Sequence, residues 1–138
     1  MIFHPLTGKC VLTYNVGIPV MLGPCNETEA WVYNEEELAL MKGSLTLCIE
    51  AYGDGQAAKL GIICGGPSSK WSMISSSMMQ LSSQVNSGNS TLCLDVGSDG
   101  RTLVTNQCLC LDESPKCDPE SQWFKLVTST RKTISMNS

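Results

Sequence analysis

The sequence predicts an all-β fold of three similar units, with about twelve short strands held together by disulfides. The main observation is a repeat of roughly forty residues, in which one cysteine precedes a second cysteine and then a tryptophan. The three copies are Cys10, Cys25 and Trp31, then Cys48, Cys64 and Trp71, then Cys93, Cys108 and Trp123. A repeat of this length indicates one supersecondary unit per copy.

Short apolar runs between turn residues give the expected strands, and no stretch shows sustained helical periodicity. In the first unit, 1–43, we expect strands at 9–14, 20–22, 31–33 and 38–41. In the second unit, 44–85, we expect them at 47–51, 58–63, 71–74 and 78–81. In the third unit, 86–138, we expect them at 92–96, 103–105, 123–126 and 132–135. Short strands in sets of four favour a closed architecture, because closure removes exposed sheet edges.

The length of 138 residues fits one compact domain, which we expect to span residues 1–138. The net charge is −4, and the nine lysines and arginines are dispersed, so nucleic acid and anionic membranes are disfavoured as partners. No apolar run reaches the roughly 18 residues of a membrane helix. The first residues also lack the basic and apolar regions of a signal peptide. We therefore expect a domain excised from a larger secreted protein.

Eight cysteines, an even number in a small chain, indicate a disulfide framework and an oxidising, extracellular compartment. The repeat predicts the bridges Cys10–Cys25 and Cys48–Cys64, each worth about 3 kcal/mol. In the third unit it favours Cys93–Cys108 with Cys110–Cys117, while Cys93–Cys110 with Cys108–Cys117 stays open. Zinc is disfavoured there because structural zinc sites have paired ligands at Cys-x₂₋₄-Cys spacing. We expect neither a metal nor a cofactor.

Two further features concern modification and catalysis. Asn26 and Asn89 begin Asn-x-Ser/Thr sequences and are expected glycosylation sites, in line with secretion. The one histidine, His4, has no nucleophile motif near it, and the carboxylates of 112–120 lie in a polar insertion that reads as a solvated loop. The sequence therefore predicts no enzyme activity within this chain. The three tryptophans are expected to form a core layer, since they recur at one position of the repeat.

The repeated tryptophans and the Cys-Leu-Asp-Val run at 93–96 resemble the ricin-B-type lectin domain, a β-trefoil whose units end near a Gln-x-Trp motif. Here the triplets end at Trp31, Trp71 and Trp123, and none has Gln first. The stretches 3–8, 22–25, 58–62 and 117–126 resemble the C-terminal domains of plant glycoside hydrolase family 5, cellulase-like proteins. This resemblance implies a parent hydrolase whose catalytic domain lies outside this chain, and a location in the plant apoplast or cell wall.

The resemblance also implies where a sugar site would lie. Ricin-type units use an Asp after the first cysteine, an aromatic platform two residues before the second, and a polar residue three before the Trp. The third unit offers Asp95, Asn106 and Glu120, while the second offers Glu50, Ile62 and Ser68. The first unit offers Leu12, Gly23 and Thr28, and the aromatic platform is absent from all three units. The expected carbohydrate-binding residues are Asp95, Asn106, Glu120 and Glu50, with Tyr52 as a substitute platform near Glu50.

Three functions remain open. The resemblance favours a carbohydrate-binding, lectin-like module that targets an attached plant glycoside hydrolase to wall polysaccharide or glycan. The missing platforms favour a degenerate trefoil that acts as a structural or interaction domain docked on the catalytic barrel. A protease inhibitor is supported only by the fold, and fold alone does not determine function.

Overall fold

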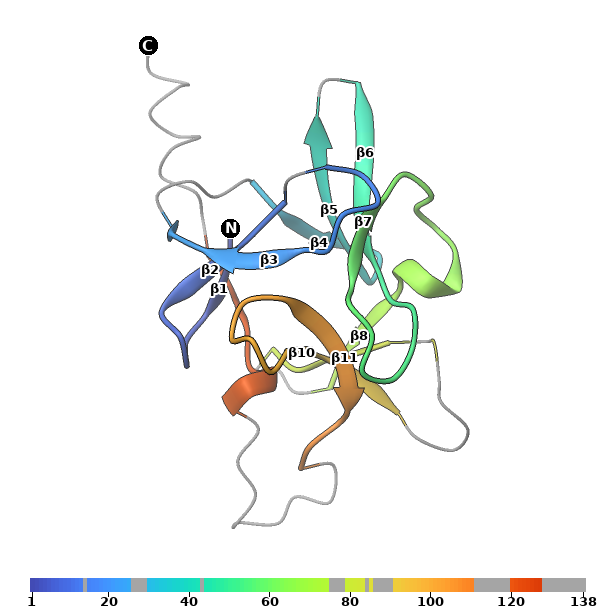
Figure 1. Ribbon diagram of the computed structural model, residues 1–138. Coiled ribbons are helices and arrows are strands. Elements are labelled where there is room, and N and C mark those ends of the chain that lie inside the picture. The colour runs from blue at the N-terminus through green and yellow to red at the C-terminus, as the bar shows by residue number, and fades with distance from the viewer. Residues whose placement is uncertain are drawn as a thin grey trace.

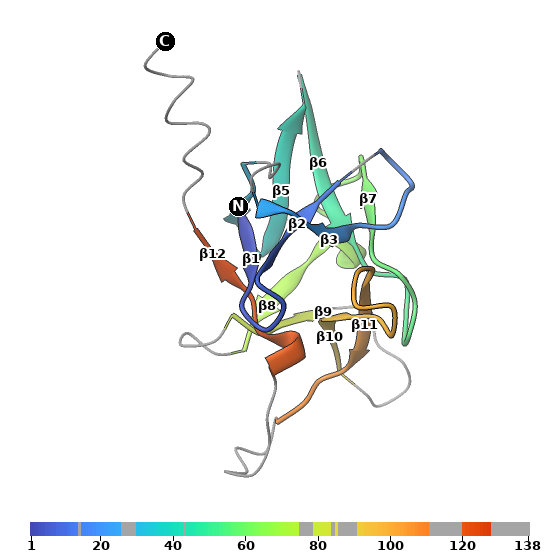
Figure 2. The ribbon, with the colours of Figure 1, turned by 60° about the vertical axis from the view of Figure 1, so that its left-hand side comes forward.

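The computed structural model describes residues 1–13, 15–25, 30–42, 44–74, 79–83, 85, 91–110 and 120–127. Within these ranges the chain forms twelve strands in three four-stranded antiparallel sheets (Figures 1 and 2). Two short 3₁₀ helices, η2 (Pro67–Ser69) and η3 (Glu120–Gln122), lie between strands. The predicted all-β class is confirmed, and the three-part arrangement is compatible with the predicted β-trefoil.

Each sheet joins the end of one sequence repeat to the beginning of the next. The first sheet has the order β12 (Lys125–Leu126), β1 (Ile2–His4), β2 (Lys9–Leu12) and β3 (Met21–Gly23). The second has the order β4 (Val32–Asn34), β5 (Glu37–Lys42), β6 (Leu45–Glu50) and β7 (Lys59–Gly61). The third has the order β8 (Trp71–Met73), β9 (Leu81–Ser83), β10 (Leu92–Val96) and β11 (Leu103–Gln107).

Strand β1 is absent from the expected strands, and it closes the first sheet. Ile2 pairs with Leu126 of β12, and Phe3 pairs with Cys10 of β2, so the two ends of the described chain lie side by side. In the other sheets, β5 and β9 hold the place that β1 takes here. The strand expected at 132–135 lies outside the described residues. The other expected strands are present, with ends that differ by no more than a few residues.

Strand register identifies the residues that occupy equivalent positions in the three sheets. Each sheet carries the first cysteine of a repeat on its third strand: Cys10 on β2, Cys48 on β6 and Cys93 on β10. Two strands away, across the middle pair, lie Lys125, Val32 and Ser72 respectively. The residues directly before these three are Phe124, Trp31 and Trp71. Phe124 therefore holds the aromatic position of the third repeat.

The prediction that Trp123 completes the core layer of tryptophans is wrong. Trp31 and Trp71 are buried, and their indole N–H groups donate to Val11 O at 3.3 Å and Ile49 O at 3.0 Å. Phe124 is likewise fully buried, whereas Trp123 is only partly buried. Adjacent residues of an extended segment point to opposite faces, so the shift by one residue turns the Trp123 indole away from the core.

The core lies where the three sheets meet. Its buried apolar residues come from every sheet and include the two tryptophans, Phe124 and a set of aliphatic side chains: Ile2, Val11, Leu22, Leu38, Ile49, Leu60, Leu81, Leu94 and Leu103. His4 is also fully buried, with its ring centre 4.9 Å from that of Phe124. The first and third repeats therefore share one packing layer through the β1–β12 closure.

Three disulfides fasten the hairpins of the three repeats. They join Cys10 to Cys25, Cys48 to Cys64 and Cys93 to Cys108, as the repeat predicts. The open alternative, Cys93–Cys110 with Cys108–Cys117, is thereby excluded. Cys110 is also disulfide-bonded. Its predicted partner, Cys117, lies outside the described residues, so the Cys110–Cys117 bridge stays a prediction.

Candidate functional site

In each sheet, the first cysteine of the repeat pairs directly with one residue of the following strand. The residue two positions after the cysteine lies diagonally across from that same residue, so the two side chains share a face of the hairpin. The three pairs are Leu12 with Gly23, Glu50 with Gly61, and Asp95 with Asn106. In the second sheet, the structure thus puts Gly61 where the sequence count put Ile62. The Cys48–Cys64 loop is one residue longer than the other two, which explains the difference.

The second-sheet pair is a partly exposed carboxylate over a glycine. A side chain on Gly61 would collide with the Glu50 carboxylate, so glycine is what gives that carboxylate its room. Ser68 Oγ lies 3.3 Å from Glu50 Oε1 and donates to it, and Lys59 pairs directly with Glu50 in the register. Tyr52 lies next to this pair with 49% of its surface exposed, and Lys59 Nζ is 5.2 Å from the centre of its ring.

The electrostatics of this group fit its geometry. Partial burial, followed by the nearby Glu50 charge, raises the pKa of Tyr52 above its ordinary value of 10.0. The phenol therefore stays neutral and keeps its donor at physiological pH. The group joins a carboxylate acceptor, a hydroxyl, and a half-exposed aromatic ring with an ammonium over one face. The predicted substitute platform, Tyr52, thus lies beside the predicted anchor, Glu50.

The corresponding pair in the third sheet is closed. The structure brings Asp95 and Asn106 together as expected, with Asn106 Nδ2 donating to Asp95 Oδ2 at 3.1 Å. Gln122 Nε2 donates to the same oxygen at 3.2 Å, and Val96 N donates to Oδ1 at 2.7 Å. Asp95 is only 6% exposed, so most of its accepting capacity is used inside the protein. In the first sheet, Leu12 covers Gly23 and offers no polar group.

Gln122 is the centre of this network, and the sequence reasoning missed it. Its Oε1 accepts from Gln80 Nε2 at 2.8 Å and from Leu109 N at 2.9 Å. Its Nε2 donates to Gln107 O at 2.9 Å as well as to Asp95. Gln122 stands two residues before Phe124, which is the Gln-x-aromatic spacing once the repeat is read in the correct frame. That spacing was the available signal.

Glu120 and Asn106 line different depressions. Glu120 is exposed at the start of η3 and lines a depression of about 320 Å³ together with Trp123, Pro5 and Leu6. Leu6 is 53% exposed, and the Trp123 indole forms part of the wall. Glu120 is thus the predicted residue that lines a depression together with an aromatic residue, Trp123.

A wider, open depression of about 430 Å³ lies on the β10–β11 hairpin, where Asn106 and Thr102 line it with the turn of Asp99. The Thr102 hydroxyl and the backbone N–H groups of Thr102 and Arg101 donate to Asp99. These bonds, led by that of the hydroxyl, lower the Asp99 pKa to about 2. The bonds shape the turn, and the role of Asp99 here is structural.

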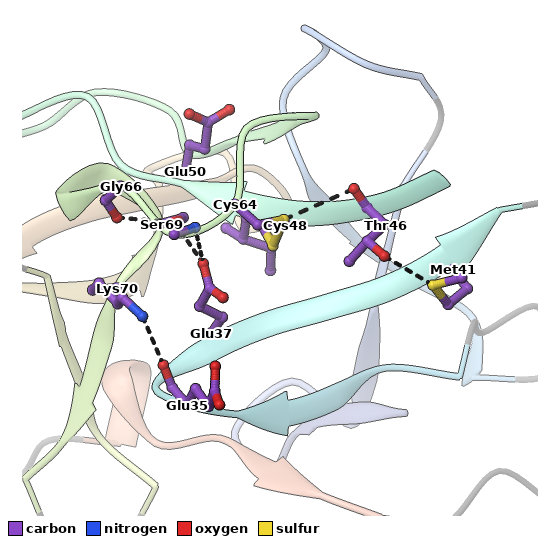
Figure 3. Close-up of a disulfide and its surroundings, with 12 residues drawn as sticks. Glu35, Glu37, Met41, Thr46, Cys48, Glu50, Cys64, Gly66, Ser69 and Lys70 are labelled. Carbon is purple, nitrogen blue, oxygen red and sulfur yellow. Dashed lines mark hydrogen bonds between the residues drawn. A yellow bond between two sulfur atoms is a disulfide. The ribbon is translucent and has the colours of Figure 1, made fainter. Parts of the chain in front are cut away.

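One group of potential metal-ligand residues consists of Glu37 and the two cysteines of the second disulfide (Figure 3). Glu37 lies near Cys48 and Cys64, but the two sulfur atoms are bonded to each other and are not thiolates. The Glu37 carboxylate accepts from Ser69 Oγ at 2.9 Å and from Gly65 N. It therefore ties the start of β5 to η2, and its hydrogen bonds account for it without a metal. The expected glycosylation sites Asn26 and Asn89 lie outside the described residues.

Within the described ranges, no helix is long and apolar enough to cross a membrane. No family model and no solved structure matches the chain. The chain is 34% identical, over 147 residues, to a protein of Chamaecyparis obtusa named glycosyl hydrolase 5 family protein. The match covers 97% of this chain but only 25% of that relative, so this chain spans about one quarter of the length of the relative it matches.

Proposed function

We propose that this chain is a carbohydrate-binding, lectin-like module of a ricin-B-like β-trefoil type, and that it targets an attached plant glycoside hydrolase to wall polysaccharide or glycan. The observation that carries the proposal is the group formed by Glu50 and Tyr52 on the second sheet. Its carboxylate is partly exposed and its ring is half exposed. Glu50 holds the anchor position that the resemblance implies, and Tyr52 stands beside it as a substitute for the missing aromatic platform.

The chemistry of a pyranose ring fits this group. Sugar hydroxyls donate to carboxylate oxygens, and the C–H face of the ring packs on an aromatic face. Lys59 adds an ammonium that donates to ring or glycosidic oxygens, and the Ser68 oxygen, whose hydrogen goes to Glu50, adds an acceptor. Ser68 already orients the Glu50 carboxylate, so the acceptor is positioned before the ligand arrives.

The third-unit residues Asp95 and Asn106 remain the other inherited candidates. Their mutual hydrogen bond and the donation from Gln122 leave little of the Asp95 carboxylate for a ligand. A sugar there would have to break bonds that already exist, whereas at Glu50 it adds bonds to a carboxylate that is partly exposed. The balance therefore favours the second sheet.

Three further elements complete the proposal. The partner is the catalytic domain of a parent hydrolase, because the similar conifer protein is about four times as long as the match. The hydrolytic chemistry belongs to that domain and not to this chain. The location is extracellular, in the apoplast or cell wall, where the three disulfides are stable.

The alternative is a structural or interaction domain docked on the catalytic barrel. It is favoured by exposed apolar side chains beyond the end of β7, where Ile62 is 59% and Ile63 is 69% exposed. Under this reading, the chain holds the hydrolase without touching carbohydrate.

Binding of the oxidised protein to an array of glycans and plant polysaccharides, including mannans and β-glucans, tests the proposal. We expect a saturable ligand whose affinity falls about tenfold or more in Glu50→Gln and in Tyr52→Ala, but little in Tyr52→Phe, which keeps the aromatic face. Glu35→Gln, an exposed carboxylate on another turn, is the matched control. A folded protein that binds nothing on the array would favour the docked structural domain.

A further inference from the structure

We propose that the depression lined by Trp123, Glu120, Pro5 and Leu6 is a second saccharide-binding surface, where a neutral pyranose ring stacks on the Trp123 indole and donates hydroxyl hydrogens to Glu120. This inference rests on the proposed carbohydrate-binding function. A ricin-type site is expected at the hairpin position that recurs in the three sheets. The inference assigns sugar binding to a surface outside that position.

Trp123 lies outside the core layer that the other two tryptophans occupy. Phe124 occupies the core place that Trp31 and Trp71 hold in the other repeats, so the fold does not require the third indole for its core. Trp123 instead lines a depression, together with a leucine that is 53% exposed. An indole and an exposed leucine that line one depression provide apolar surface for the C–H side of a sugar ring.

Hydrogen bonds of His4 hold both sides of the depression, the η3 side and the side of Pro5 and Leu6. His4 Nε2 lies 2.9 Å from Ser121 O and donates to it, so buried β1 holds η3 in place. The backbone carbonyl of the same His4 accepts from Gly8 N at 2.9 Å and closes the turn that carries Pro5 and Leu6. Figure 2 shows η3 beside this β1–β2 turn. One buried residue therefore fixes the two halves of the depression, which lowers the entropic cost of binding.

The described residues that line the depression combine a carboxylate with apolar groups. This combination favours a ligand that donates hydrogen bonds to the carboxylate and has an apolar face, as a neutral sugar ring does. The volume of about 320 Å³ is at the lower end of ligand pockets and suits one or two sugar rings.

Tryptophan fluorescence offers a direct test, because two of the three tryptophans are buried. Acrylamide should quench mainly Trp123, and soluble β-linked gluco- and manno-oligosaccharides should protect it at concentrations that match their binding isotherm. Trp123→Ala should weaken binding about tenfold at this surface, Trp123→Phe less, and Glu120→Gln several-fold. Leu126→Ala, which removes a similarly exposed apolar group on β12, is the control and should bind like the parent protein. The melting temperature of each variant reports whether it is folded.

The outcomes separate this inference from the function on which it rests. Protection of Trp123 that is weakened several-fold in Glu120→Gln but kept in Glu50→Gln would support a second surface. Saccharide binding that disappears in Glu50→Gln and is unchanged in folded Trp123→Ala and Glu120→Gln would overturn the second surface and leave the proposed function standing. A folded parent protein that binds none of these saccharides, with no change in quenching, would overturn both.

Discussion

Replacing Gln122 by methionine should destabilise the protein by about 4 kcal/mol, a large share of the stability of a domain this size. Methionine nearly keeps the volume of glutamine but removes its amide. The substitution abolishes the four hydrogen bonds from Gln80 and Leu109 and to Asp95 and Gln107. At about 1 kcal/mol for each bond, the loss is about 4 kcal/mol, because Gln122 is fully buried and water does not replace its partners.

Urea unfolding of the oxidised protein, followed by tryptophan fluorescence, measures this effect directly. A loss of about 4 kcal/mol corresponds to a fall of roughly 10–15 °C in melting temperature for a chain of this length. Gln107→Met is the matched control, since the Gln107 side chain is exposed and only its backbone carbonyl joins the network. If Gln122→Met unfolds within about 1 kcal/mol of Gln107→Met, the network does not stabilise the fold and the reasoning is wrong.

Two other predictions concern His4 on β1 and the disulfide partner of Cys110. Burial lowers the pKa of His4 from its ordinary value of 6.5, so the unfolded chain binds more protons than the folded one as pH falls below 6.5. The free energy of unfolding should therefore decrease from pH 7.5 to 5.5, with a shallower decrease in His4→Gln; an identical pH dependence would contradict this assignment. Peptide mapping without reduction should find Cys110 linked to Cys117, and Cys110 linked to any other cysteine would refute the predicted pairing.

Much of the fold can be predicted from the repeat, because its cysteines form the disulfides and its apolar runs form the buried strands. The disulfide Cys93–Cys108 and the strand Leu92–Val96 are placed as predicted. Strand β1 was not predictable in the same way, since three residues carry little periodic signal and form a strand only by pairing with β12, which lies at the other end of the chain. Long-range pairing of this kind is not encoded in local pattern.

The aromatic frame of the third repeat shows a second limit. Both Trp123 and Phe124 suit a core position, and the pattern of tryptophans selected the first. Strand register selected the second, and a shift of one residue exchanges the buried and exposed faces. When the repeat is aligned on Trp123, Gln122 is the variable middle residue of the triplet. When it is aligned on Phe124, Gln122 takes the Gln position of the motif, and it is the centre of a buried hydrogen-bond network. Composition identified the right segment, but only pairing with β1 determined which side chains face the core.

The divergence of the three equivalent hairpins explains why their binding capacities should differ. One position carries Leu12, Glu50 or Asp95, and its diagonal neighbour is a glycine in the first two cases and Asn106 in the third. Leucine fills the space over the first glycine, and Asn106 with Gln122 satisfies the third carboxylate from within. Only at Glu50 is a carboxylate combined with a small neighbour. Under the proposed function, the three equivalent hairpins would therefore provide one sugar site, at Glu50, and a second contact with a polysaccharide would have to come from another surface, such as the depression at Trp123.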